Sequence, residues 1–269
     1  MLTIRPPTPA ELPLLKDFAP PDWNTDLSIT FSFHYGQPYF HPLVAELDGK
    51  VAGCANGLLN GNAGWLGNII VLPEFRGRGI GYALTAELVK FFRDRDVVHQ
   101  ILIATQMGEP VYRKLGFETV SHYVFLRRET ERDPGPAADV RPATARDYPA
   151  ILALDQVITG ERRALFLSHF LSDAWVHTSP WDTVNGFYLP GLASGPVLAE
   201  NDASGLELLK VRLGRGAQTT VVPQANAAAL DFLRSHGFVE TARAPRMVLG
   251  SDAAWKPERV YSRGSGYSG

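Results

Sequence analysis

The amino-acid sequence repeats one order of structural signals, and this repeat constrains the fold more than any other feature. The segment LTIRPPTPAELPLL at the N-terminus is echoed by DVRPATARDYPAIL from residue 139, each an extended stretch ending in Arg-Pro, then a threonine and an amphipathic helix. The segment EPVYRKLGF at 109–117 is echoed by NAAALDFLRSHGF at 226–238, and each helix ends at Gly-Phe. We therefore expect a duplicated α/β unit in this chain of 269 residues.

Hydrophobic periodicity and turn residues predict the elements of the first half. We expect a strand at 2–7, a helix at 9–19, a hairpin at 42–60, a strand at 64–73, a helix from about 81 to 95 with Leu84, Leu88 and Phe91 on its apolar face, a strand at 101–105, a short helix at 110–116 and two closing strands. The polar, proline-containing stretch 128–139 is typical of a linker. The predicted domains are 1–130 and 139–269, joined by 131–138, and each is an α/β domain with a central, mostly antiparallel sheet flanked by helices.

Composition excludes several classes of protein. The formal net charge is −2 and no basic run stands out, so we expect no nucleic-acid partner. No stretch approaches the ~20 apolar residues that span a bilayer, and the N-terminus lacks an apolar signal core, so we expect no membrane association. The single cysteine, Cys54, cannot form an internal disulfide, which favours a cytoplasmic location. Its apolar context, VAGCANG, favours a buried core role over a nucleophilic one. The seven histidines show no metal-ligand spacing, so no metal is expected.

The segment VLPEFRGRGIGYAL at 71–84 is the sharpest motif. An apolar strand ends at a proline, and the turn RGRGIG leads directly into an amphipathic helix. The first N–H groups of a helix lack internal partners, and the helix dipole adds positive potential there. Gly77, Gly79 and Gly81 let phosphate oxygens approach the backbone, and Arg76 and Arg78 add charged donors. A solvated glycine-rich turn is the alternative; the spacing fits neither the dinucleotide fingerprint nor an NTPase phosphate loop.

This segment resembles the acyl-CoA signature of the GNAT superfamily of N-acetyltransferases, Arg/Gln-x-x-Gly-x-Gly/Ala, at Arg76, Gly79 and Gly81. The ending Tyr-x-x-Leu-Gly-Phe, from Tyr112 to Phe117, also fits, and the match spans about residues 2–130. The resemblance implies a coenzyme site for acetyl-CoA, and the expected residues are Ile69, Val71, Arg76, Gly77, Arg78, Gly79, Ile80 and Gly81.

The resemblance also implies a catalytic scheme. The amides from Arg76 to Gly81 would hold the pyrophosphate, the backbone of Val71 would pair with the pantetheine arm, and splaying of its strand would expose an oxyanion-stabilising amide. Tyr112 occupies the position of the acid that protonates the departing thiolate; a tyrosine packed on a helix face is the alternative. The family's common asparagine, seven residues before that tyrosine, is here Thr105.

The general base stays open. Glu46, His34, His41 and Asn68 are the polar residues expected nearest the cleft, each with a surface or hairpin role as its alternative. Deprotonation through water would need no single base.

The second half keeps the order of elements and loses the motif. Its segment ENDASGLELL replaces PEFRGRGIGYAL, and Leu233 stands at the tyrosine position, although Asn226 fits the family's asparagine. We expect one coenzyme site in the chain, with the second half a degenerate domain that either covers the first or carries the acceptor pocket.

The sequence thus predicts transfer of an acetyl group from acetyl-CoA to a primary amine. A small-molecule amine is favoured over a protein lysine or N-terminus as the acceptor, and a homodimer stays open. The alternatives are a non-catalytic acyl-CoA sensor or scaffold, O-acyl transfer, and a longer acyl donor.

Overall fold

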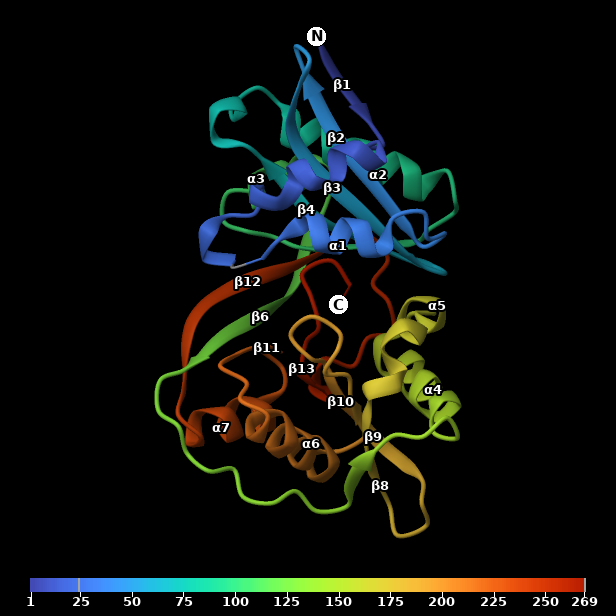
Figure 1. Cartoon of the computed structure of the whole chain (residues 1–269), viewed down its shortest axis with the longest axis vertical. Helices are drawn as coiled ribbons and strands as arrows, with labels where there is room; N and C mark the ends of the chain where they lie inside the picture. The colour runs from blue at the N-terminus through green and yellow to red at the C-terminus, as the bar shows by residue number, and fades with distance from the viewer. Residues whose placement is uncertain (24, 269) are drawn as a thin grey trace. The chain divides into compact units, whose positions relative to one another are not determined.

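The computed structural model describes residues 1–23 and 25–268 (Figure 1). The chain folds as two compact units. Unit 1 comprises Met1–Glu118, Met247–Ser251 and Gly266–Ser268, and unit 2 comprises Thr119–Arg246 and Asp252–Ser265. Unit 1 therefore receives two short segments from the C-terminal part of the chain. No helix in the described part of the chain is both long and apolar enough to cross a membrane.

Unit 1 is built on a sheet with the strand order β1-β2-β3-β4-β5, followed by the end of β12. The first four strands pair antiparallel, while β4 and β5 are parallel. The strands are β1 (Leu2–Arg5), β2 (Phe40–Leu47), β3 (Lys50–Asn60), β4 (Ala63–Val71), β5 (His99–Ile103) and β12 (Phe238–Gly250). The helices are η1 (Pro9–Asp17), η2 (Pro21–Trp23), α1 (Leu27–His34), η3 (Pro73–Phe75), α2 (Ile80–Arg93) and α3 (Glu109–Lys114).

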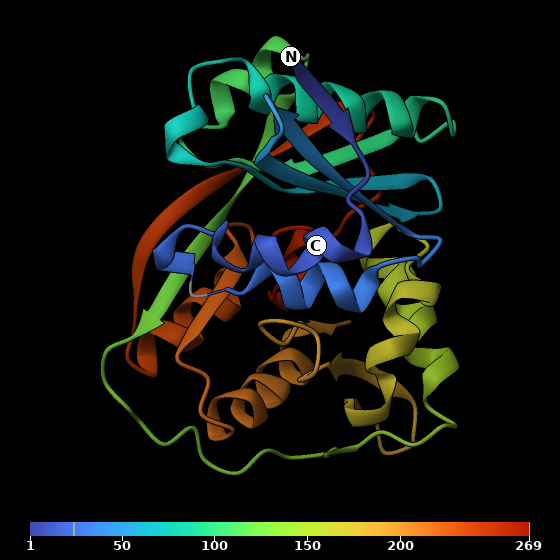
Figure 2. The same ribbon diagram turned by 45° about the horizontal axis from the view of Figure 1, so that its top comes forward.

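Helix α2 covers one face of this sheet, and η1 and α1 lie on the other (Figure 2). The apolar face of α2 buries Leu84, Leu88 and Phe92 completely. Two glycines make room for Phe92, because a Cβ at Gly57 or Gly64 would come within 2.9 or 2.6 Å of its ring. The sequence pattern assigned this face to Phe91, which is only partly buried, so the third core residue is its neighbour Phe92.

The first helical segment is a 3-10 helix, whereas the sequence predicted only a helix. Pro13 lies inside η1 and removes one N–H donor, which an α-helical ladder would need. The turn is held at its start by Thr8 and Glu11, which form a reciprocal capping box. Two buried leucines, Leu12 and Leu15, anchor the segment.

Unit 2 carries a second sheet with the strand order β13-β10-β9-β8-β7. Its strands are β7 (Val140–Pro142), β8 (Trp175–Thr178), β9 (Val184–Tyr188), β10 (Val197–Ala199) and β13 (Val260–Ser262). Two further strands, β6 (Glu118–Arg128) and β11 (Thr219–Pro223), pair antiparallel with each other. The helices are α4 (Tyr148–Thr159), α5 (Ala164–Leu167), η4 (Ser168–Asp173), α6 (Asp202–Gly214), α7 (Ala227–Ser235) and η5 (Pro257–Arg259).

The last strands of the two halves are exchanged. Strand β6 follows α3 in the sequence, yet it pairs with β11 in unit 2, and the end of β12 lies beside β5 in unit 1. The prediction of two closing strands after α3 was wrong, because 118–128 forms one unbroken strand. Strand pairing joins residues far apart in sequence, so the local pattern does not identify a strand's neighbour.

One side-chain motif occurs in both halves and supports the duplication. In the first half, Arg5 donates to both carboxylate oxygens of Glu11, at 2.9 and 2.6 Å. In the second half, Arg141 donates to Asp147 in the same way, at 2.8 and 2.9 Å. In each motif the intervening threonine also donates its backbone N–H and hydroxyl to the carboxylate. The same bidentate clasp therefore ties the first strand to the following turn in both repeats.

Candidate active site

A β-bulge interrupts β4 near its end. Cys54 pairs with Ile70 and Asn56 with Gly67, so two residues of β4 face one residue of β3. One of the two, Asn68, has φ of 50°, the left-handed region that asparagine tolerates better than most residues. Its side-chain amide donates to Asn56 Oδ1 at 2.7 Å. This bond between two asparagines fixes the local turn of the strand.

Beyond its first three residues, β4 separates from β5. The parallel pairing joins Ala63–Trp65 with residues 99–101 and involves no later residue of either strand in the described structure. The backbone of β4 from Leu66 to Val71 is therefore open along its β5 edge. Ile69 and Val71 lie on this open stretch, and both are partly buried. The splayed strand that the family resemblance implied is present at this place.

The turn that follows β4 is shaped by two glycines in the left-handed region. Gly77 and Gly79 have φ of 76° and 77°, and a Cβ at either position would meet nothing within 4 Å. Gly79 is also the N-cap of α2 and offers no side chain to the helix N-terminus. Gly81, in the first turn of α2, faces only a Val71 methyl group at 3.8 Å. The space above this helix N-terminus is open.

The first amides of α2 have no hydrogen-bond acceptor in the described part of the chain. Across residues 1–23 and 25–268, no N–H from Gly77 to Tyr82 donates to a backbone or side-chain acceptor, and the first helical bond comes from Ala83. Arg76 and Arg78 are exposed and form no ion pair with a described carboxylate. Arg76 Nε instead donates to the Val71 carbonyl at 3.1 Å. A row of free donors beside two cations is suited to a pyrophosphate.

Tyr112 projects from α3 into the core of unit 1. It is 7% exposed, and burial raises the pKa of its phenol to about 12. A Cβ at Gly108 would lie 2.9 Å from its hydroxyl, so the glycine admits this oxygen to the start of the helix. The backbone carbonyl of Thr105 accepts from the Gly108 and Glu109 amides, and its hydroxyl also accepts from the Gly108 amide at 3.1 Å. The departure from asparagine at position 105 thus falls on the turn before α3, whose N-cap is Gly108.

The four candidate bases lie in different environments. Glu46 accepts two hydrogen bonds from Arg5 at the sheet edge, which gives it a structural role. His41 stacks on Phe91 with ring centroids 3.7 Å apart, and burial together with the Arg95 cation lowers the pKa of its imidazole to about 4.

The other two candidates lie nearer the opening in β4. Asn68 forms the bulge itself. His34, 2% exposed at the end of α1, makes hydrogen-bond contacts with the hydroxyls of Tyr39 and Tyr267. Sequence reasoning missed Asn56 and Tyr267; an asparagine inside the apolar strand VAGCANG was the available signal for the first. Cys54 is fully buried, as expected, and burial raises the pKa of its thiol.

Helix α6 of unit 2 corresponds to α2, but its N-terminus is covered by side chains. Its N-cap Asn201 accepts from the Ser204 amide at 3.0 Å, and the adjacent Asp202 accepts from the Tyr261 hydroxyl at 2.6 Å. The Tyr261 ring also fills the space over the helix, since a Cβ at Gly205 would lie 2.3 Å from it. At this N-terminus one amide is capped by a side chain, a carboxylate lies beside the cap, and an aromatic ring occupies the space.

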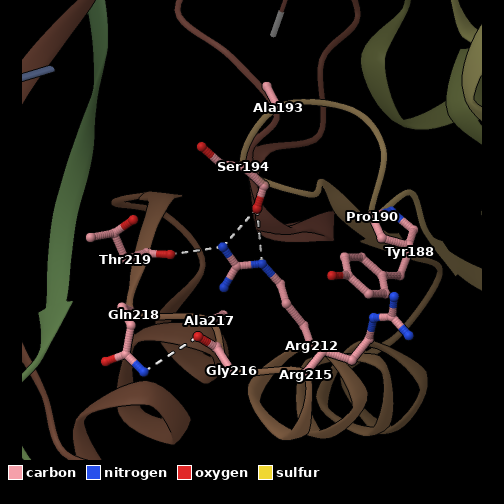
Figure 3. Close-up of a pocket in the computed structure, with 10 residues that line it drawn as sticks. All are labelled: Tyr188, Pro190, Ala193, Ser194, Arg212, Arg215, Gly216, Ala217, Gln218 and Thr219. Atoms are coloured by element: carbon pink, nitrogen blue, oxygen red, sulfur yellow. Dashed lines mark hydrogen bonds between the residues drawn. The ribbon is translucent and has the colours of Figure 1, made fainter. Parts of the chain in front are cut away.

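A hollow of about 230 Å³ lies at the opposite end of the same helix (Figure 3). Its buried Arg212 donates to the backbone carbonyls of Ser194, Gly195 and Thr219. Figure 3 shows the guanidinium between the carbonyls of Ser194 and Thr219. A cation at a helix C-terminus complements the dipole, so Arg212 fastens the 193–195 loop to the start of β11.

The comparisons with known proteins agree with this geometry. The acetyltransferase (GNAT) family model matches residues 10–117, and a second acetyltransferase (GNAT) domain model matches residues 151–262. The chain belongs to the GNAT acetyltransferase family and carries two GNAT domains in tandem. The mixed α/β fold predicted from the sequence is confirmed.

Two curated relatives match parts of the chain. An acetyltransferase of Pectobacterium atrosepticum is 37% identical over 113 residues, which cover 40% of this chain and 79% of the relative. A putative ribosomal protein bS18 alanine N-acetyltransferase of Bacillus subtilis is 27% identical over 84 residues, 30% of this chain and 56% of that protein.

Solved structures resemble the whole chain. A putative acetyltransferase from Pyrococcus horikoshii aligns with a TM-score of 0.85 at 21% identity, covering 100% of this chain and 96% of that one. A GCN5-related N-acetyltransferase from Sphaerobacter thermophilus aligns with a TM-score of 0.64 at 16% identity, covering 94% and 98%. At these identities the likeness shows the fold alone.

Proposed function

We propose that this protein transfers an acetyl group from acetyl-CoA to a primary amine, using a single coenzyme site in unit 1. The observation that carries the proposal is the row of unpaired amides from Gly77 to Tyr82, which directly follows the open stretch of β4. A ligand with a pyrophosphate at one end and an amide-containing arm at the other fits this succession. Family membership supports an acyltransferase activity.

In this proposal, each part of the motif has its own role. The amides from Gly77 to Gly81 bind the pyrophosphate, whereas the expected Arg76 amide already donates to the Pro73 carbonyl at 3.3 Å. The arm pairs with the open backbone at Ile69 and Val71. For Val71 this requires Arg76 to release the carbonyl that it holds, which frees its guanidinium for a phosphate. An amide beside the bulge would stabilise the negative charge on the attacked carbonyl oxygen.

Tyr112 assists the departure of the thiolate. The neutral amine attacks the thioester carbon, the C–S bond breaks, the amine loses a proton and the sulfur gains one. With its pKa raised to about 12, the phenol remains protonated throughout the physiological range. It is a weaker acid than a thiol, whose reference pKa is about 8.5, so its main contribution is a hydrogen bond donated to the developing thiolate.

We infer a small-molecule amine as the acceptor, because a formal net charge of only −2 gives the chain little attraction for a basic protein segment. The name of the Bacillus relative specifies an alanine of a ribosomal protein, so an N-terminal alanine is the second candidate. We place the protein in the cytoplasm, where its one buried cysteine is compatible with reducing conditions. The proposed chemistry uses no metal, and a homodimer stays a hypothesis.

Replacing Tyr112 with phenylalanine tests the chemical role. We expect Tyr112→Phe to lower kcat about a hundredfold, the size of a general acid–base contribution, with acetyl-CoA affinity changed less than about twofold. Thiol release in stopped assays measures the first quantity and calorimetry the second. In the parent enzyme, kcat should show no loss from Tyr112 ionisation as pH rises to about 11, since the protonated phenol is the active form.

A matched control is Tyr35→Phe, which removes a hydroxyl that donates to the Pro7 carbonyl in the same unit. Unchanged kcat in Tyr112→Phe, with the chemical step limiting, would remove Tyr112 from the mechanism. Acetyl-CoA binding without transfer to any amine would favour the sensor or scaffold function.

A further inference from the structure

A short segment near the C-terminus, Gly266–Ser268, belongs to unit 1. The segment directly before it, Asp252–Ser265, belongs to unit 2. Tyr267 packs directly on Gly67 of β4, because a Cβ at this glycine would lie 2.1 Å from the Tyr267 Cβ and 2.8 Å from its Cα. Only glycine at position 67 admits the backbone of the tail to this strand.

The contact has a defined place on the sheet. Side-chain directions alternate along a strand, so Gly64 and Gly67, three residues apart, face opposite sides. A Cβ at Gly64 would meet the Phe92 ring of α2, so Gly67 and Tyr267 lie on the face away from α2. Gly67 also directly precedes the bulge at Asn68. Tyr267 is therefore about two residues, or ~7 Å along β4, from Ile69.

Tyr267 is fixed by contacts with α1. Its hydroxyl lies 3.3 Å from Nε2 of His34, and the two rings meet edge to face with centroids 6.0 Å apart. The other ring nitrogen of His34 lies 3.1 Å from the Tyr39 hydroxyl, and both His34 and Tyr39 are buried. Buried His34 thus holds Tyr267 at this point, and Tyr39 holds His34 in turn.

We propose that Tyr267 forms the acceptor-side wall of the transfer site and positions the incoming amine. This inference rests on the proposed function. The coenzyme pyrophosphate would occupy the N-terminus of α2 and its arm the open edge of β4, which leaves the face away from α2 for the amine. There the Tyr267 ring supplies a flat apolar surface that excludes water and limits the size of the acceptor. The C-terminal half of the sequence, which has no coenzyme site in the proposed function, thereby contributes Tyr267 to the site in unit 1.

The test compares variants of Tyr267 in the full-length protein. Thiol release from acetyl-CoA is measured with phenethylamine, spermidine, glucosamine and an alanine-initiated peptide, and also without any amine. We expect Tyr267→Ala to raise the ratio of kcat/KM for bulky amines to kcat/KM for small amines about tenfold, because the ring no longer limits the size of the acceptor. The same variant should raise amine-free hydrolysis. Tyr267→Trp should shift the same ratio in the opposite direction. Tyr267→Phe keeps the ring and should restore the parent ratio.

A control variant and a binding measurement separate the outcomes. Trp181→Ala removes an aromatic side chain that is 89% exposed in unit 2, and it should change neither quantity. The inference would be overturned if Tyr267→Ala and Tyr267→Trp both bind acetyl-CoA normally and both keep the kcat/KM ratio and the amine-free hydrolysis within about twofold of the parent. Failure of the proposed function has a different signature, since the unchanged protein would then bind no acetyl-CoA or release no thiol.

Discussion

Helices α2 and α6 hold corresponding places in the two repeats, yet their N-termini differ in every feature that matters for an anion. At α2 the cap is Gly79, and the first amides are free. At α6 the cap is Asn201, whose side chain accepts from the first turn, and Asp202 adds a negative charge. The Tyr261 ring occupies the remaining space. The two halves share the order of elements, but α6 has a side-chain cap, a carboxylate and a ring at its N-terminus, whereas the N-terminus of α2 has a glycine cap and open space.

This difference shows how a repeated fold can keep its architecture and lose a site. Every helix N-terminus has unpaired amides that must find partners. A side-chain cap satisfies one of them within the chain and stabilises the helix by about 1 kcal/mol. A glycine cap omits that gain and leaves the amides for a ligand. The architecture needs only the helix, whereas binding needs an uncapped one.

The largest loss of acetyl-CoA binding is expected when the turn before α2 is given an acidic residue, as α6 has at its own N-terminus. We expect Gly79→Asp to weaken acetyl-CoA binding at least about a hundredfold, because a carboxylate would compete for the amides and repel the pyrophosphate. Calorimetry measures the loss. Gly216→Asp is the matched control, since Gly216 also has a positive φ of 87° and open space around its Cβ position. Equal losses of binding in both variants would attribute the effect to backbone strain.

A smaller effect is expected where the two halves are alike. Asp147→Asn and Glu11→Gln each remove the charge from an arginine clasp, and we expect each to lower the free energy of unfolding by about 1–3 kcal/mol. Asp147 should cost more, because its side chain is 7% exposed against 19% for Glu11. Urea unfolding at neutral pH measures both. A cost in only one half would show that the shared motif has lost its role in the other.

The clasps also predict an acid dependence. Hydrogen bonds from Arg5 and the Thr8 backbone lower the Glu11 pKa from 4.5 to about 2. A lowered pKa contributes stability that is complete above the unfolded value and is lost as the pH falls from about 4.5 to about 2. The difference in stability between the parent and Glu11→Gln should therefore shrink over this range.

The sequence predicted the order of elements from β2 to α3 and the position of the glycine turn, because both rest on local signals, but it did not predict helix α1. Strand and helix periods and turn residues can be read within a short window. The bulge at Asn68 was not predicted, since a left-handed asparagine inside an apolar strand leaves no local pattern. The exchange of β6 and β12 and the contact of Tyr267 with Gly67 depend on pairing across more than a hundred residues. The pattern of one segment does not reveal its distant neighbour.

The residues of the glycine turn could be identified from a local motif, whereas the candidate bases could not be told apart from the sequence. Gly77 and Gly79 have the backbone conformation that the motif required, and Tyr112 lies where its helix was expected. Their roles in binding and catalysis stay predictions. Among the candidate bases, packing decides the outcome, since His41 is stacked on an aromatic ring and Glu46 is held by Arg5. The sequence shows which polar side chains are present but not which neighbours they contact in the fold.

The account's central claim is that only one of the two repeats binds the coenzyme. Calorimetric titration of the purified chain with acetyl-CoA, alongside an Arg76→Ala/Gly79→Asp double variant, tests it most directly. We predict one site per chain in the parent and none in the variant, with the variant still folded by circular dichroism. Two sites per chain, or one site that survives in the double variant, would contradict the claim.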